Sequence, residues 1–197
     1  MRFCHLLVFV LITVSAYAQF TDSFDDEDFS QDPQWLGDAE EFQVDIYRQL
    51  RLNNLAPGTN NESHLSVAST VALEAVWEFK VGFDGLSSSG LSNSNKMLVY
   101  LISDQANLES DPQGYYVLIG GTLDEISLYS TLAGKLIDGP DGVTASSSGL
   151  FSIRVTRSQT GQWELQTDNS GGQNLSLVGT AVNTDFISSS FFGVLCD

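Results

Sequence analysis

A short segment, Glu125 to Tyr129, carries the side chains that come nearest to a hydrolytic pattern in this sequence. If it forms a strand, Glu125, Ser127 and Tyr129 share one face, because side chains alternate along a strand. Retaining hydrolysis of a glycosidic bond needs two carboxyl groups about 5–5.5 Å apart. Ser127 and Tyr129 stand where a second carboxyl would be required, and Asp124 points to the opposite face. One carboxylate cannot act as both nucleophile and acid, so the segment predicts binding rather than catalysis.

The same face offers groups suited to holding a sugar. Tyrosine supplies a ring and a hydroxyl, and arginine supplies a fork of donors. The sequence therefore predicts a ligand-binding groove formed by Tyr116, Glu125, Ser127, Tyr129 and Arg154. The alternative for Arg154 is an ion pair with an acid on the next strand, for which Glu164 is the expected partner.

Acidic residues near the N-terminus suggest a second kind of site. Asp22, Asp25 and Asp26 lie within a few residues of one another, and calcium takes several oxygen ligands. Their spacing matches no established calcium loop, and a solvated acidic edge is the alternative. Calcium is thus the one cofactor that the sequence allows for. His64 and Cys196 each lack the neighbours that a metal or nucleophilic site would require.

Composition narrows the range of partners. The 197 residues carry 8 basic and 25 acidic side chains, giving a formal net charge of −17. Nucleic acid and anionic membrane surfaces are disfavoured, because their phosphates would be repelled. Neutral glycans or other extracellular surface components remain as partners, and the sequence gives no oligomeric state.

The elements that must position these residues are strands. In residues 150–167, Phe151, Ile153 and Val155 alternate with polar residues, and Trp163 and Leu165 resume the pattern after a Gly-containing turn. Period-2 alternation around such a turn predicts an antiparallel hairpin with one buried face. Further strands are expected at 42–52, 64–70, 72–83, 96–103, 115–120, 123–130, 175–180 and 190–196, and a turn-rich segment is expected at 134–148. Residues 19–41 are expected to form an N-terminal strand and a loop whose aromatic rings dock on the sandwich. Together they predict an all-β antiparallel sandwich of the jelly-roll type.

Residues 1–18 have the organisation of a secretory signal peptide. Arg2 precedes an apolar run, and Ala16-Tyr17-Ala18 is a small-x-small cleavage site. Cleavage would leave Cys196 as the single cysteine, so the fold cannot depend on an internal disulfide. Residues 19–197 then form one domain of a secreted or cell-surface protein.

Several segments resemble a known family. These segments are FTDSFDDEDFSQDPQWLGDAEEFQV, WEFKVGF, YYVLIGGTLDEISLYS, TRSQTGQWELQTD and FFGVLCD. They resemble the N-terminal region of secreted bacterial proteins that carry lamin-tail or other surface modules downstream. That region is similar to the concanavalin A-like lectin/glucanase jelly roll. The resemblance implies one more strand after FFGVLCD, so the chain is expected to lack its final strand.

Three functions follow from these observations. The first is a non-catalytic, lectin-like or adhesive module that binds carbohydrate. The second is a glucanase-like glycoside hydrolase, which would need a second acid facing Glu125. The third is a structural spacer that binds no small ligand. The absence of a paired acid in sequence favours the first.

Overall fold

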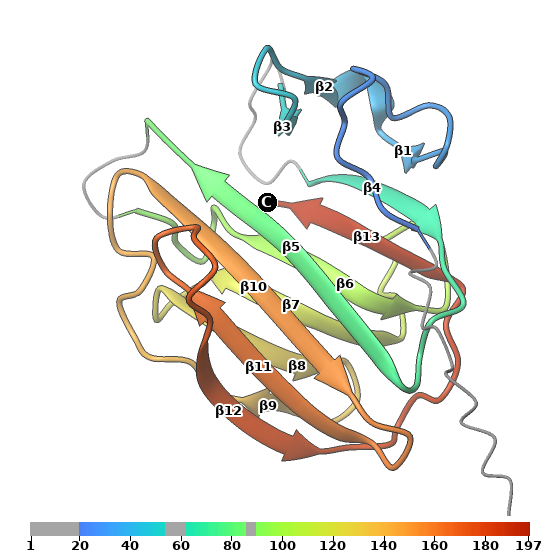
Figure 1. Cartoon of the computed structure of the whole chain (residues 1–197), viewed down its shortest axis with the longest axis vertical. Coiled ribbons are helices and arrows are strands. Elements are labelled where there is room, and N and C mark those ends of the chain that lie inside the picture. The colour runs from blue at the N-terminus through green and yellow to red at the C-terminus, as the bar shows by residue number, and fades with distance from the viewer. Residues whose placement is uncertain (1–19, 54–61, 86–89) are drawn as a thin grey trace, which may run out of the picture.

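Two antiparallel sheets lie face to face and form the body of the protein (Figure 1). The computed structural model describes residues 20–53, 62–85 and 90–197. The larger sheet has seven strands in the order β1-β4-β13-β6-β7-β8-β9, and the smaller has four in the order β12-β11-β10-β5. The predicted all-β antiparallel sandwich is confirmed.

The larger sheet comprises β1 (Leu36–Gly37), β4 (Ser63–Ala68), β6 (Met97–Ser103), β7 (Gly114–Gly120), β8 (Glu125–Ser130), β9 (Gly134–Ile137) and β13 (Phe191–Cys196). The smaller sheet comprises β5 (Ala75–Phe83), β10 (Gly149–Arg157), β11 (Gln162–Asp168) and β12 (Ser176–Val182). A separate hairpin joins β2 (Phe42–Val44) to β3 (Leu50–Leu52), after the 3-10 turn Ala39–Glu41. No helix in these described segments is long and apolar enough to cross a membrane.

The hairpin expected at 150–167 is β10 and β11. Ile153 pairs with Thr167 and Val155 with Leu165 across it. Gly161 makes the turn with φ +79°, and its N–H donates to the Ser158 carbonyl at 3.1 Å. A glycine reaches this left-handed backbone conformation without strain, which explains its place in the turn.

Aromatic side chains fill the space between the sheets. Trp163 is fully buried and stacks on Trp77 at 5.7 Å between ring centroids, and Tyr115 lies 4.5 Å from it on the other sheet. Ile153, Val155 and other aliphatic side chains complete this core. These contacts stabilise the folded protein, because they bury apolar area and because the rings adopt favourable relative orientations.

A buried arginine crosses the same core. Arg157 is 2% exposed, and its guanidinium carbon lies 4.9 Å from the Tyr115 ring centroid and 4.7 Å from that of Trp163. It donates to the carbonyls of Ala72 at 2.9 Å and Phe186 at 2.7 Å. Burial lowers the pKa of this guanidinium. Through these hydrogen bonds and ring contacts, Arg157 links both sheets and the segment before β13 within an otherwise apolar core.

Three strand assignments from the sequence need correction. Residues 42–52 form a hairpin rather than one strand, because the Asp45 carboxylate accepts the Tyr47 and Gln49 N–H groups and closes a turn. Residues 134–137, expected to be part of a turn-rich segment, form strand β9. In the N-terminal segment, the strand is limited to Leu36 and Gly37.

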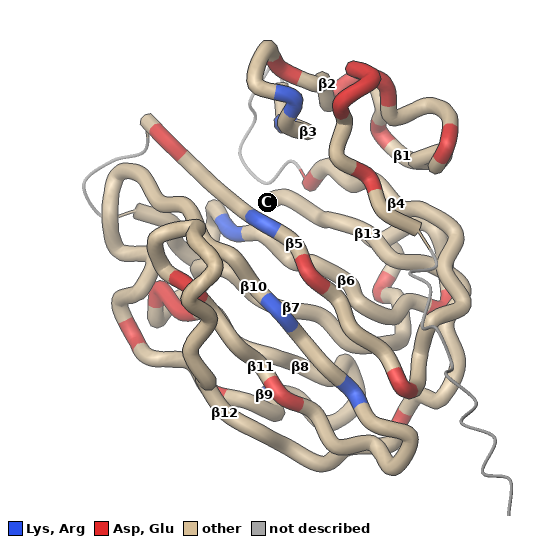
Figure 2. The backbone as a smooth tube through the Cα atoms, viewed as in Figure 1, with Lys and Arg blue, Asp and Glu red and all other residues tan. Residues whose placement is uncertain are grey.

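The N-terminal segment nevertheless packs on the sandwich through its aromatic rings, as predicted. Phe20, Phe24 and Phe29 pack with Trp35 against side chains of β4 and β13. Acidic side chains gather in this segment near β1 and β2, whereas β5 and β10 carry mixed charges (Figure 2). The predicted signal peptide falls within residues 1–19, outside the described residues, and the expectation of a further strand after Cys196 stays a prediction.

Candidate functional site

Three tyrosines form a row on the face of the larger sheet that points away from the core. Tyr100, Tyr116 and Tyr129 are cross-strand neighbours on β6, β7 and β8. Their ring centroids are 5.2 Å and 5.3 Å apart, and the rings of Tyr116 and Tyr129 are parallel to within 5°. We call these residues the tyrosine row. Leu108 and Leu195 pack on Tyr100, so the open end of the row is at Tyr129.

A hollow of about 260 Å³ lies beside the open end of the row. We call it the tyrosine hollow. Its lining includes Tyr116, Tyr129, Glu125, Lys135, Asn93 and Thr122. The strands β7, β8 and β9 supply most of these groups, because alternate residues of adjacent strands point to the same face.

The charged side chains that line the hollow are Glu125, Lys135 and Lys96, of which the first two form an ion pair. Glu125 is 3% exposed, and its carboxylate accepts the Tyr129 hydroxyl at 3.1 Å and the Lys135 ammonium at 2.8 Å. Lys135 also donates to Asp138 at 2.5 Å. The hydrogen bonds that Lys135 donates to Asp138 and Glu125 raise its pKa, so this side chain stays charged at all ordinary pH values.

The position of Asp138 corrects the expectation that Glu125 has no second carboxyl group near it. Glu125 does have a second carboxyl nearby, contributed by the residue just after β9, and both touch the same ammonium. The hydrogen bond from Lys135 lowers the pKa of Asp138, which is therefore ionised at neutral pH. Glycoside hydrolysis requires one carboxyl held in its protonated form, and Asp138 does not provide it.

The Tyr129 ring already has neighbours over its faces. Tyr116 stacks on one side of Tyr129, and the Lys135 nitrogen lies 5.8 Å from the Tyr129 ring centroid. A sugar would need an open ring face to stack on. A ligand in this hollow would thus meet hydroxyls and charged groups, which recognise it by hydrogen bonds.

The structure brings together three of the five predicted groove residues. Tyr116, Glu125 and Tyr129 line the hollow, whereas Ser127 is fully buried and accepts the Gly139 N–H at 2.8 Å. Arg154 lies on β10 of the other sheet.

Arg154 has a different partner from the one expected. It forms an ion pair with Glu78 on β5, not with Glu164. In the observed register Arg154 is opposite both Glu78 and Gln166, and Glu164 is opposite Thr156. Sequence reasoning also missed Lys135, because strand β9 was not predicted and its four residues, GKLI, show no alternation of polar and apolar side chains.

The three N-terminal acids expected to bind calcium have separate partners. Asp22 accepts the Phe24 N–H at 2.9 Å and the Trp35 indole N–H at 2.8 Å. Asp25 accepts the Ser23 hydroxyl, and Asp26 accepts a backbone N–H. Within the described residues, these carboxylates do not form a group with converging ligand atoms. Calcium at this position stays a prediction that these contacts do not support.

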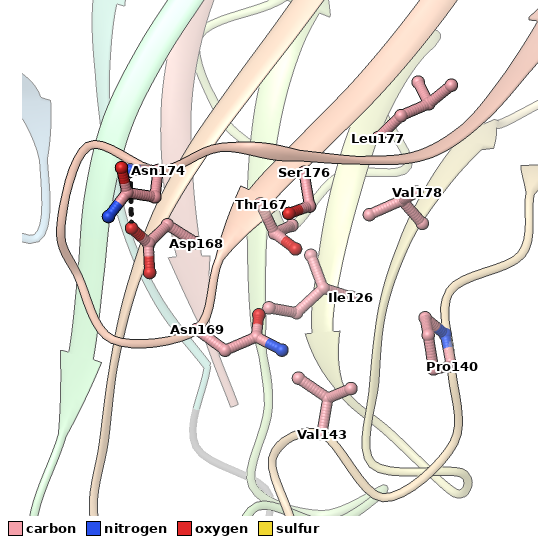
Figure 3. A pocket seen from close by; sticks show the side chains of 10 residues that line it. All are labelled: Ile126, Pro140, Val143, Thr167, Asp168, Asn169, Asn174, Ser176, Leu177 and Val178. Atoms are coloured by element: carbon pink, nitrogen blue, oxygen red, sulfur yellow. Dashed lines mark hydrogen bonds between the residues drawn. The ribbon is translucent and has the colours of Figure 1, made fainter.

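A second cavity, of about 300 Å³, opens between the sheets near the β11–β12 loop (Figure 3). Asp168 is the acidic residue in its lining, and both of its carboxylate oxygens accept hydrogen bonds. One oxygen accepts the Ser170 N–H at 2.9 Å, and the other accepts the Asn174 N–H at 2.8 Å. The hydrogen bonds from Ser170 lower the pKa of Asp168. Its role is to hold the loop, and apolar side chains such as Ile126 and Val143 form much of the remaining lining.

The tyrosines provide a test of this packing. Burial is the largest cause that raises the pKa values of Tyr100, Tyr115, Tyr116 and Tyr129. The unfolded chain loses these protons near pH 10, before the folded chain does, so the free energy of unfolding should fall as pH rises above about 10. Tyrosinate absorbance at 295 nm should therefore rise with unfolding, in step with the loss of far-ultraviolet circular dichroism. If these four tyrosines lost their protons near pH 10 while the protein remained folded, their burial in the folded protein would be contradicted.

The two facing antiparallel sheets define a concanavalin A-like β-sandwich. No family model matches this chain, and no curated protein sequence matches it. Solved structures do share the fold. The Emp46p carbohydrate recognition domain in its potassium-bound form aligns with a TM-score of 0.56 at 11% identity, over 90% of this chain and 87% of that one. The VIP36 exoplasmic/lumenal domain in its Ca2+/Man-bound form aligns with a TM-score of 0.54 at 11% identity, over 82% and 74%.

Some of these neighbours hold a metal ion, which raises the question whether the tyrosine hollow would accept calcium. It does not fit that ion. Calcium takes six to eight oxygen ligands, whereas the Glu125 carboxylate is already occupied by the Lys135 ammonium and the Tyr129 hydroxyl. The lysine occupies the position next to Glu125 that a cation would need.

Proposed function

We propose that this chain is a non-catalytic carbohydrate-binding module and that a neutral glycan binds in the tyrosine hollow. The fold shared with carbohydrate recognition domains supports this proposal. The observation that carries it is the set of oriented polar groups, Tyr116, Tyr129, Glu125 and Lys135, around one hollow. Its volume lies just below the range of about 300–1,000 Å³ for drug-sized ligands, which suits a short glycan terminus.

The chemistry of the hollow determines which glycans fit. With a net charge of −17, the protein repels acidic sugars, so the ligand is neutral. Lys135 takes the place of a metal ion beside Glu125, so binding requires no calcium. The Lys135 ammonium, whose side chain is 27% exposed, and the Tyr116 hydroxyl then recognise sugar hydroxyls by direct or water-mediated hydrogen bonds.

A glycan array probed with the full chain tests this proposal. We expect binding to neutral glycans that is unchanged by EDTA. Tyr116→Phe removes one hydroxyl, for which no protein partner exists among the described residues, and should weaken binding about 5–10-fold. Tyr47→Phe is the matched control, because Tyr47 is 74% exposed on the β2–β3 hairpin, and should leave affinity unchanged.

Three results would contradict the proposal. The first is the absence of binding to any neutral glycan in a folded preparation, which would favour the structural spacer. The second is an affinity that Tyr116→Phe does not alter, which would place the binding site elsewhere. Release of reducing sugar from a bound glycan would favour the hydrolase instead and would point to Glu125 and Asp138.

We also infer that the module acts outside the cell, since the sequence of residues 1–18 has the order of a signal peptide. The resemblance to secreted bacterial proteins with lamin-tail modules, which itself stays a prediction, also favours a location outside the cell. Detection of a chain that begins at Gln19 in the culture medium would test the signal peptide directly.

A further inference from the structure

A histidine and two carboxylates meet at the β1 edge of the larger sheet, away from the tyrosine hollow. Asp38 follows β1, His64 lies on β4, and Glu109 belongs to the connection between β6 and β7. One ligand atom from each lies within 4.8 Å of the other two. The His64 Nδ1 is 2.9 Å from Asp38 Oδ2 and 3.1 Å from Glu109 Oε1. We call this group the histidine site.

One ring nitrogen cannot satisfy two carboxylates. Nδ1 carries at most one hydrogen, which can point along one of the two contacts but not both. The imidazole is only 9% exposed, so water has little access to it. Two anions directed at one buried nitrogen leave an excess of negative charge that a cation placed among the three atoms would balance.

We propose that the histidine site binds a divalent transition-metal ion, with zinc as the best match. Zinc takes imidazole nitrogen and carboxylate oxygen at about 2.0–2.2 Å, which places neighbouring ligand atoms about 3.0–3.5 Å apart. The observed 2.9 and 3.1 Å separations need only small side-chain adjustments to reach this spacing. Calcium would need more oxygen ligands than the site offers and would make little use of the imidazole.

Neighbouring hydrogen bonds hold the ligands in place, as is usual around metal sites. The His64 N–H donates to Asp38 Oδ2 at 2.8 Å, and the Asp38 N–H donates to the His64 carbonyl at 3.0 Å. The Glu109 N–H donates to the Asn107 side chain at 2.9 Å.

The position of the site suggests what the ion would do. Glu109 follows Leu108, which is 1% exposed and packs on Tyr100 at the closed end of the tyrosine row. A metal ion bound by Asp38, His64 and Glu109 would therefore fasten the β6–β7 connection and the N-terminal segment to β4. The proposal concerns structure and does not depend on glycan binding.

Calorimetric titration of the full chain with zinc chloride, after treatment with chelator, tests the proposal. We expect one zinc ion per chain, with calcium binding at least 10-fold weaker. Glu109→Gln removes a ligand from an exposed loop position and should weaken zinc binding at least 10-fold. Glu40→Gln is the control, because Glu40 is an exposed acid in the neighbouring 3-10 turn and should change nothing.

Thermal unfolding gives a second readout. At free zinc about 100 times its Kd, the melting temperature should rise by about 5–10 °C in the original chain but not in Glu109→Gln. Circular dichroism establishes that the variant is folded. Zinc binding that is absent, or that survives unchanged in Glu109→Gln, would overturn the proposal and would leave the three residues as a hydrogen-bonded cluster without a metal ion.

Discussion

Replacing Arg157 by methionine is expected to lower the free energy of unfolding by about 3–5 kcal/mol. Methionine retains the apolar stem but leaves the buried carbonyls of Ala72 and Phe186 without their donors. It also removes the charge that lies over the Tyr115 and Trp163 rings. Urea unfolding followed by tryptophan fluorescence would measure the loss.

Arg154→Met is the matched control for this prediction. Arg154 lies on the same strand, three residues away, but its side chain is 41% exposed and pairs with Glu78 on the surface. Exposed ion pairs contribute about 0–1 kcal/mol, so this variant should remain close to the original stability. Equal losses in the two variants would show that Arg157 does not tie the core together.

Replacing Lys135 by methionine is expected to cost about 2–3 kcal/mol at neutral pH. The reason is that the Glu125 carboxylate, which is 3% exposed, loses its cationic partner. The Tyr129 hydroxyl alone remains on the carboxylate. Lys80→Met, at an exposed position on β5, serves as the control and should have little effect.

A double variant identifies the cause of this loss. In Lys135→Met/Glu125→Gln the buried carboxylate is replaced by a neutral amide of similar shape, so no charge is left without its partner. We therefore expect the double variant to recover most of the stability that Lys135→Met loses. A loss of the same size in the single and double variants would indicate packing rather than charge.

Strands with strict alternation could be predicted from the sequence, since burial of one face fixes the pattern. Phe151, Ile153 and Val155 define β10 in this way, and the turn at Gly161 defines its partner. Residues 42–52 also alternate, but the Asp45 side chain closes a turn within them, and local hydrogen bonding of that kind leaves no mark on the apolar pattern.

The candidate site could be predicted only in part. Glu125 and Tyr129 share a strand, so alternation alone places them on one face. Lys135 comes from a four-residue edge strand that is too short to show periodicity, and Arg154 lies on the other sheet. Which strands become neighbours depends on pairing between segments that are far apart in the sequence. Local patterns of apolar and polar residues do not reveal this pairing.

The position of β13 has a consequence for how the molecule is made. This strand comes last among those described, yet it lies between β4 and β6 and pairs with both. While the chain leaves the ribosome, the two halves of the larger sheet stay apart, each with a bare edge able to accept a foreign strand. These two halves join only when Phe191–Cys196 inserts between them. We therefore expect slow maturation and a need for chaperones that shield both edges.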